Sequence, residues 1–272
     1  MDLGLTDKVV VVTGGSSGIG LETARHFASE GARVVIAARR EEQLAKAAAS
    51  IAESTGASVD TLSTDVTKLA DLDRLVAHVT TAHGRIDVLV NNAGNGTYKP
   101  FLEVTDEELV QGMEINFFAQ FRLTQRFAPM MIEQGGGVVV NVTGETAIRV
   151  TQPPFRSSCT GPAKAAENRL SKILATELGE HGIRVVAVVP GFVNTEERFA
   201  RWGEGLGGGL DAENDRAAAA ERRREWGRGI ARPGHEWGTP QELADLIVFA
   251  ASKRATFVNG AVLVADGGDD KS

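Results

Sequence analysis

The sequence has little of what secreted, nucleic-acid-binding or membrane-spanning proteins need. It contains one cysteine, Cys159, so no internal disulfide can form and a disulfide-built secreted domain is excluded. Acidic residues outnumber basic ones by 36 to 29, and the net charge of −7 argues against a general nucleic-acid binder. No apolar run approaches the roughly 18 residues of a membrane-spanning helix, and residues 1–8 lack the regions of a signal peptide. We therefore expect a cytoplasmic protein with neither a nucleic-acid nor a membrane partner.

Metal ligands and tyrosines are also scarce. The five histidines are scattered, and none lies at ligand spacing from the cysteine or from another histidine, so the sequence predicts no metal site. The chain has one tyrosine, Tyr98. Hydrophobic residues are abundant. They make up 42% of the 272 residues, which is enough to build a core without disulfides or metals.

Short β-branched runs alternate with longer helical patterns along the chain. The apolar residues of these runs are continuous, as in strands that are covered on both faces. Alternation of strands and helices predicts an α/β fold with a parallel sheet, and right-handed crossovers make that sheet doubly wound. The predicted strands cover Lys8–Thr13, Arg33–Ala38, Ser58–Ser63, Ile86–Asn91, Gly137–Val142, Arg184–Val189 and Ala261–Ala265. The predicted helices cover Gly18–Glu30, Glu41–Thr55, Leu69–His83, Asp106–Ile132, Gly161–His181 and Pro240–Ala251.

No linker divides this pattern, so we expect one domain over residues 1–272, a Rossmann-type fold with seven parallel strands and helices on both faces of the sheet. The segment 196–237 interrupts the rhythm, because it is too long for an ordinary connection. It is either a solvated insertion or a lid over a substrate pocket. We favour the lid, in which Trp202 and Trp226 would supply apolar lining.

A glycine-rich turn joins the first predicted strand to the first helix. Its glycines permit a tight bend and the close approach of a pyrophosphate, which the N–H groups at the helix start would bind. With a strand before it and a helix after it, the turn predicts a nucleotide site. The predicted contacts here are Gly14, Ser16, Ser17, Gly18, Ile19 and Gly20.

These residues, Thr13 to Gly20, read TGGSSGIG, which resembles the TGxxxGxG turn of the short-chain dehydrogenase/reductase family. The resemblance extends from about residue 6 to residue 268, with further motifs in the family's order: Asp65-Val66, Asn91-Asn92-Ala93-Gly94, Asn116, Lys164, Pro190-Gly191 and Asp266-Gly267-Gly268. It implies a nicotinamide cofactor, held by the turn and by Asp65, Val66, Asn92, Ala93, Gly94, Lys164, Pro190, Gly191 and Val193. It also implies a homodimer or homotetramer, to which the largely apolar helices at 106–132 and 161–181 would contribute.

The choice between the two nicotinamide cofactors follows from charge. An acid at the end of the second strand would bind the ribose 2′-hydroxyl and repel a 2′-phosphate, whereas arginine does the reverse. Here that position is Ala38, and Arg39 and Arg40 follow it. The sequence therefore predicts NADP(H).

The family's catalytic set is Asn, Ser, Tyr and Lys, and this chain departs from it at two positions. Four residues before Lys164, where the family has its acid Tyr, stands Thr160. Gly144 falls on the Ser position, although Thr143 or Thr146 could reach the same space. We expect Lys164 to bind the ribose and to assist electrostatically, and Asn116 to hold a water beside it. Thr160 would hydrogen-bond the substrate oxygen or a relay water.

Three explanations remain open for the missing phenol. In the first, the acceptor needs no acid, as for a quinone or a conjugated enone. In the second, another residue supplies the proton for an ordinary ketone: Tyr98 is the first candidate, and Glu145, which otherwise is a solvated loop carboxylate, is the second. In the third, catalysis is lost and an NADP(H)-binding sensor or scaffold remains. We favour an oxidoreductase that passes hydride between nicotinamide and a small apolar carbonyl compound.

Overall fold

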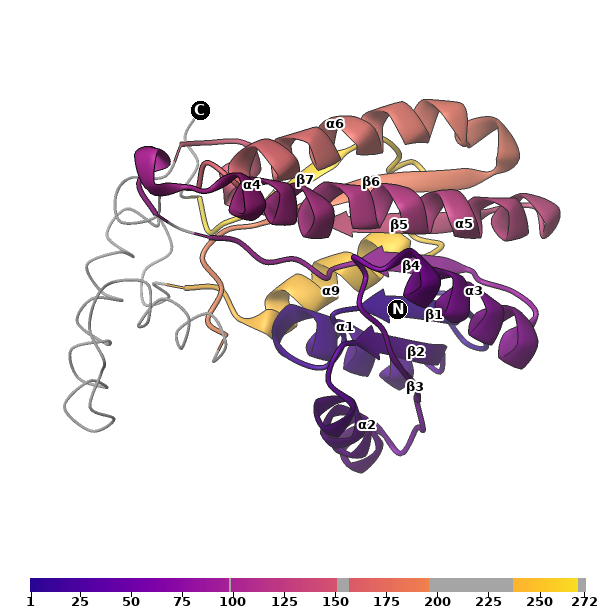
Figure 1. The fold of residues 1–272 in the computed structure, drawn as a ribbon. Coiled ribbons are helices and arrows are strands. Elements are labelled where there is room, and N and C mark those ends of the chain that lie inside the picture. Colours follow the sequence, from indigo (N-terminus) through magenta and orange to yellow (C-terminus); the bar gives the residue numbers. More distant parts are fainter. Residues whose placement is uncertain (98, 151–156, 196–236, 269–272) are drawn as a thin grey trace.

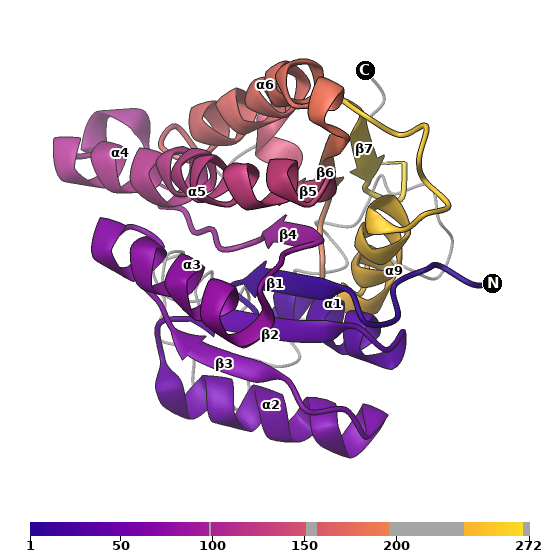
Figure 2. The same cartoon turned by 90° about the vertical axis from the view of Figure 1, so that its right-hand side faces the viewer.

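The computed structural model describes residues 1–97, 99–150, 157–195 and 237–268. The described residues contain a seven-stranded sheet in the order β3-β2-β1-β4-β5-β6-β7, and every strand pairing in it is parallel. The predicted doubly wound α/β fold is thereby confirmed. Helices lie on both faces of this sheet, and the carboxyl ends of the strands share one edge (Figures 1 and 2).

The strands are valine-rich and deeply buried because both sheet faces are covered. In β1 all five residues are buried. Ends differ from the predictions by one or two residues, as expected for strand boundaries. The bounds are β1 Val9–Thr13, β2 Arg33–Ala38, β3 Asp60–Ser63, β4 Val88–Asn91, β5 Gly137–Val142, β6 Ile183–Pro190 and β7 Val262–Ala265.

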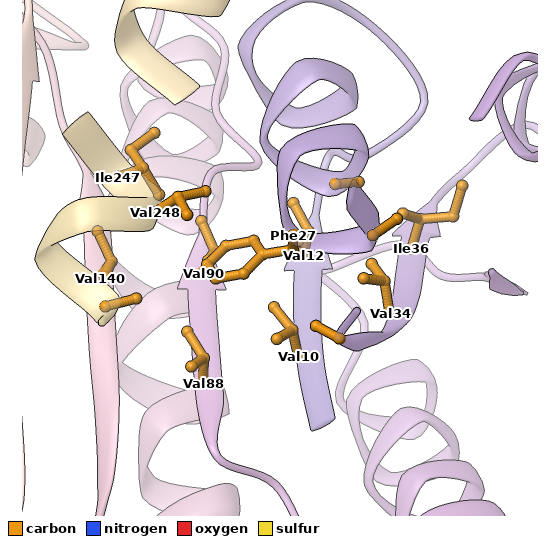
Figure 3. Packing of buried hydrophobic residues seen from close by; sticks show 14 of the residues in the cluster. Val10, Val12, Phe27, Val34, Ile36, Val88, Val90, Val140, Ile247 and Val248 are labelled. Atoms are coloured by element: carbon orange, nitrogen blue, oxygen red, sulfur yellow. The ribbon is translucent and has the colours of Figure 1, made fainter. Parts of the chain in front are cut away.

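Two apolar layers sandwich the sheet. On one face α1, α2 and α9 contribute residues to a core around Val10, Val12 and Phe27 (Figure 3). On the other face α3, α5 and α6 pack around Leu89, Phe127 and their neighbours. The main helices are α1 Gly18–Ser29, α2 Glu41–Thr55, α3 Leu69–His83, α4 Asp106–Met113, α5 Ala119–Glu133, α6 Gly161–Glu177 and α9 Pro240–Ala251.

Two predicted helices differ in the structure. The single helix expected over 106–132 is wrong: α4 and α5 are separated by one π-helical turn, Glu114–Phe118. π-Helical turns are rare in proteins, but those that occur often lie at functional sites. The helix expected over 161–181 ends at Glu177, and a short 3₁₀ turn, Gly179–His181, follows it. The positive φ of 72° at Gly182 then turns the chain into β6.

The flanks of the predicted lid are joined to each other. Val193 forms a parallel bridge with Gly238, in which Asn194 N–H donates to the Gly238 carbonyl at 2.8 Å. Beside them the rings of Phe192 and Trp237 meet edge to face, with centroids 5.1 Å apart. The segment 196–236 itself, with Trp202 and Trp226, lies outside the described residues, so the lid stays a prediction. In the described part of the chain no helix is long and apolar enough to cross a membrane.

Candidate active site

The glycine-rich turn is built so that backbone reaches the carboxyl edge of the sheet with no side chain in the way. Gly14 has a φ of +67°, which favours glycine, and its N–H donates to the Ala37 carbonyl at 2.7 Å. A β-carbon on Gly20 would lie 2.3 Å from the Gly14 oxygen, so a larger residue would force the turn open. Ser17, the N-cap of α1, makes no side-chain capping bond, and the helix start thus fits an external anion.

The end of β4 holds this turn in place. The Asn92 amide donates to the carbonyls of Thr13 and Gly14 at 3.0 and 3.3 Å. The backbone N–H groups of Asn92 and Ala93 both donate to the Thr13 hydroxyl, at 3.0 and 3.1 Å. β1 and β4 are neighbours in the sheet but not in the sequence, so the turn lies where the strand order switches direction. In doubly wound sheets this is where ligands bind.

The other predicted cofactor residues follow strand ends on the same edge. Arg39 and Arg40 are exposed after β2, where a phosphate would meet them in solvent. Asp65 follows β3 and accepts from the N–H and hydroxyl of Thr67, at 3.0 and 2.8 Å, so its carboxylate shapes the turn that presents buried Val66. The cofactor contact of Asp65 and Val66 stays a prediction.

The turn after β6 is equally close-packed. Pro190 is the last residue of β6, and the Gly191 N–H donates to the Ala265 carbonyl at 3.0 Å. A β-carbon on Gly191 would lie 2.6 Å from the Cα of Asp266, so glycine lets the two loops touch. Val193 is buried next to them. Together with Ser16, Gly18, Ile19 and Gly94, these positions line one edge, and the described residues fit a bound dinucleotide.

Lys164 lies in α6 with its side chain 7% exposed. Its Nζ donates to the Val142 carbonyl and to Glu167 Oε2, each at 3.0 Å. An ammonium has three hydrogens, so one has no acceptor among the described residues. A β-carbon on Gly94 would lie 3.2 Å from Nζ, which places the ammonium beside the loop that follows β4.

Asn116 is buried in the π-helical turn and anchors that same loop. Its Nδ2 donates to the carbonyls of Asn95 and Gly112, at 2.5 and 2.9 Å. Its Oδ1 accepts from the Asn95 N–H at 3.2 Å. Both amide hydrogens are therefore used by protein carbonyls, and the side chain could bind the predicted water only through a remaining lone pair of Oδ1.

The hydroxyls expected to assist are placed differently from one another. Thr160 is buried at the start of α6, and within the described structure its Oγ1 has no hydrogen-bond partner. A β-carbon on Gly96 would lie 2.0 Å from that Oγ1, so the hydroxyl touches the loop beyond Gly94. Thr143 instead donates to the Val188 carbonyl at 3.3 Å. A β-carbon on Gly144 would meet open space, so the family's serine would fit there.

The two alternative acids have different outcomes. Tyr98 lies outside the described residues, so its candidacy stays a prediction. The interpretation of Glu145 as a solvated loop carboxylate is wrong, because the side chain is buried. It is 7% exposed and forms an ion pair with Arg149, one helical turn further on. Its burial follows from the short 3₁₀ turn Glu145–Ala147, which packs against α6.

Sequence reasoning missed Glu167, the acidic partner of Lys164. The signal was its position three residues later, on the same face of a predicted helix. Burial raises the pKa of the Glu167 carboxyl to about 7, although the Lys164 ammonium acts in the opposite direction. Cys159 is buried, and the burial raises the pKa of its thiol, which makes it a poor nucleophile.

A glycine-rich strand-to-helix turn at the switch point of a doubly wound parallel sheet defines the nucleotide-binding α/β class of proteins. A family model described as "short chain dehydrogenase" matches residues 8–202. The chain belongs to the short-chain dehydrogenase/reductase family of oxidoreductases.

Named relatives cover nearly the whole chain. The chain is 34% identical to "Dehydrogenase/reductase SDR family member 4" of Oryctolagus cuniculus, over 97% of this chain and 94% of that protein. It is 32% identical to "7alpha-hydroxysteroid dehydrogenase" of Bacteroides fragilis, over 96% and 94%. The crystal structure of L-sorbose reductase from Gluconobacter frateurii, complexed with NADPH and L-sorbose, matches with a TM-score of 0.89 at 33% identity, covering 100% of both chains.

Proposed function

We propose that the protein is an NADP(H)-dependent oxidoreductase that passes hydride between nicotinamide and a small apolar carbonyl compound, without the phenolic acid of its family. The observation that carries this proposal is the site itself. Among the described residues Lys164 has two hydrogen-bond acceptors for its three ammonium hydrogens, and a buried threonine hydroxyl, not a phenol, lies one helical turn before it. Bound NADPH would supply the hydride.

NADP(H) is favoured over NAD(H) by the two exposed arginines after β2. Their guanidinium groups suit a 2′-phosphate, and Ala38 leaves no carboxylate to repel it. The NADPH bound in the related L-sorbose reductase supports the same choice. The resemblance and the exposed apolar side chains of α5 and α6, Phe121 and Ile173, also support a homodimer or homotetramer.

The missing phenol restricts the acceptor. Loss of a positioned general acid costs about 10²–10⁴ in rate, or roughly 3–5.5 kcal/mol of barrier. Threonine is far less acidic than a phenol, so Thr160 can donate a hydrogen bond or orient a water but cannot simply replace the acid. A quinone avoids the cost, because hydride addition gives a resonance-stabilised hydroquinone anion that water can protonate. Conjugated enones are the next best acceptors.

In this mechanism the chain's own residues act by position and charge. Lys164 would direct its remaining N–H and its positive charge at the oxygen where negative charge develops. Asn116 would hold the loop at Asn95 in place, through the three bonds it makes there and to Gly112. Thr160 would donate its unpartnered hydroxyl hydrogen to the substrate oxygen or to a water.

A panel assay tests the proposal. NADPH oxidation is followed with purified protein and matched quinones, conjugated enones and isolated ketones. Turnover of quinones or enones with ketones silent is the expected result. Turnover of isolated ketones would mean that another acid is present, and Tyr98→Phe and Glu145→Gln would then locate it.

The second candidate function is an NADP(H)-binding sensor or scaffold without catalysis. It is favoured by the substitution of two catalytic positions, Thr160 and Gly144, in an otherwise intact site. Tight NADPH binding with no turnover across the panel would establish it and overturn the oxidoreductase proposal.

A further inference from the structure

Glu167 is an unusual neighbour for a site lysine. It lies in α6 one turn after Lys164, its side chain is fully buried, and its Oε2 is 3.0 Å from Lys164 Nζ. Its other oxygen, Oε1, is buried and has no hydrogen-bond partner among the described residues. A carboxylate is rarely buried in this way unless a function or a partner retains it.

Lys164 is the charged group of the described structure that influences the pKa of the Glu167 carboxyl. α6 packs against β5, β6, the π-helical turn and the 3₁₀ turns at Glu145 and at Gly179–His181. The charged groups of the first four have partners of their own: Glu114 pairs with Arg122, Glu145 pairs with Arg149, and Arg184 donates to backbone carbonyls. In the turn at Gly179–His181, Glu180 and His181 are exposed and lie 3.6 Å from each other. Desolvation raises the pKa of Glu167 and Lys164 lowers it, with no other charged group contributing in the described structure.

We propose that Glu167 is a positioning residue that sets the net charge Lys164 presents to the candidate active site. When the Glu167 carboxyl is ionised, it holds Nζ against the Val142 carbonyl and the pair is neutral. When it is protonated, the same geometry presents a full positive charge. The catalytic part of this proposal rests on the proposed function, whereas the charge switch does not.

The switch matters because Thr160 stands where the family has its phenol. Among the described residues that we assign to catalysis, Lys164 is the one whose charge can help an oxygen that gains negative charge. A neutral pair gives less help than a cation, so turnover should fall as pH rises through the titration of Glu167. A neutral pair would also acidify a phenol poorly, which is consistent with threonine at position 160.

The charge switch is tested on protein without cofactor. Infrared difference spectra are recorded between about pH 5 and pH 9, a range that spans the titration of a buried carboxyl. The wild type should show the C=O band of a protonated carboxylic acid that disappears near neutral pH. Glu167→Gln should lack this band, and Glu177→Gln, an exposed acid on the same helix, should keep it. A wild type without such a band, or a Glu167→Gln protein that retains it, would overturn the proposal.

The catalytic consequence is tested with the acceptor that the panel identifies. Wild-type kcat should fall at least about tenfold from acid to alkaline pH, the size expected for one unit charge acting near the site. Glu167→Gln keeps an oxygen that can accept from Nζ, so its kcat should stay flat near the acid value. A Glu167→Gln profile that follows the wild type would contradict the assignment.

The outcomes separate the two proposals. If no acceptor is turned over, the proposed function fails while the infrared titration still decides the charge switch. If Glu167→Gln does not fold, Glu167→Asp serves instead: its carboxyl is one methylene shorter, so the titration midpoint must move. An unmoved midpoint would assign the titration to another group and overturn the proposal.

Discussion

Replacing Glu167 by glutamine should change how the stability of the protein depends on pH. The Glu167 carboxyl has an ordinary pKa of 4.5 when the chain is unfolded and a pKa of about 7 when it is folded. Because the folded-state pKa is raised, its contribution to stability is fully present below about pH 4.5 and is lost as pH rises towards 7. The shift of about 2.5 units corresponds to about 3 kcal/mol at 1.36 kcal/mol per unit.

The assay is urea unfolding of the wild type and Glu167→Gln at about pH 4.5 and pH 8, with free energies taken from linear extrapolation. The wild type should lose about 3 kcal/mol relative to the variant between the two pH values, while titrations common to both proteins cancel. In thermal unfolding this is a difference of roughly 10 °C. Glu177→Gln should follow the wild type, because that acid is exposed. Parallel pH dependences for the wild type and Glu167→Gln would refute the burial argument.

Three further predictions concern the cofactor turn, cofactor choice and the missing phenol. Gly20→Ala would place a β-carbon against the Gly14 oxygen, so NADPH binding measured by fluorescence should weaken at least about tenfold. The control Gly179→Ala, at a position that is remote from the turn and uncrowded, should bind NADPH normally. Unchanged NADPH binding in Gly20→Ala would contradict the proposed cofactor site. Arg39→Asp should weaken NADPH binding at least about tenfold and leave NADH binding nearly unchanged, since it replaces attraction for the 2′-phosphate by repulsion; equal losses for both would refute the charge argument. At about pH 6, where Glu167 is protonated and Lys164 keeps its full charge, Gly144→Ser with Thr160→Tyr should raise ketone turnover by about 10²–10⁴. Ketones that stay silent at that pH in a folded, NADPH-binding variant would refute the role of the missing acid.

The fold followed from the sequence because its strong signals are local. The valine runs of β1 and β6 match strands buried on both faces, and the glycines of the turn match positions where backbone approaches backbone. The break at Glu114–Phe118 was missed because that stretch contains no glycine or proline to mark it. Its π-helical turn accompanies the bonds of Asn116 to the loop after β4, which only the tertiary structure brings close.

The site was predictable in position but not in charge. The motifs place Lys164, Asn116 and Thr160 near one another because parallel strands end on a common edge. Burial of Glu145 and Glu167 depends on packing between α6, the sheet and the 3₁₀ turn, which composition does not reveal. An acid three residues after a lysine in a helix predicts an exposed ion pair. Here the pair of Lys164 and Glu167 is buried.

The central claim is hydride transfer to an apolar acceptor that needs no phenolic acid. It is tested most directly by steady-state NADPH oxidation with a quinone and a structurally matched isolated ketone, in the wild type and in Lys164→Met. The account predicts turnover of the quinone, no turnover of the ketone, and a large loss of kcat on removal of the lysine charge. Ketone turnover at a rate comparable to the quinone, in a protein whose Thr160 stands where the acid should be, would contradict it.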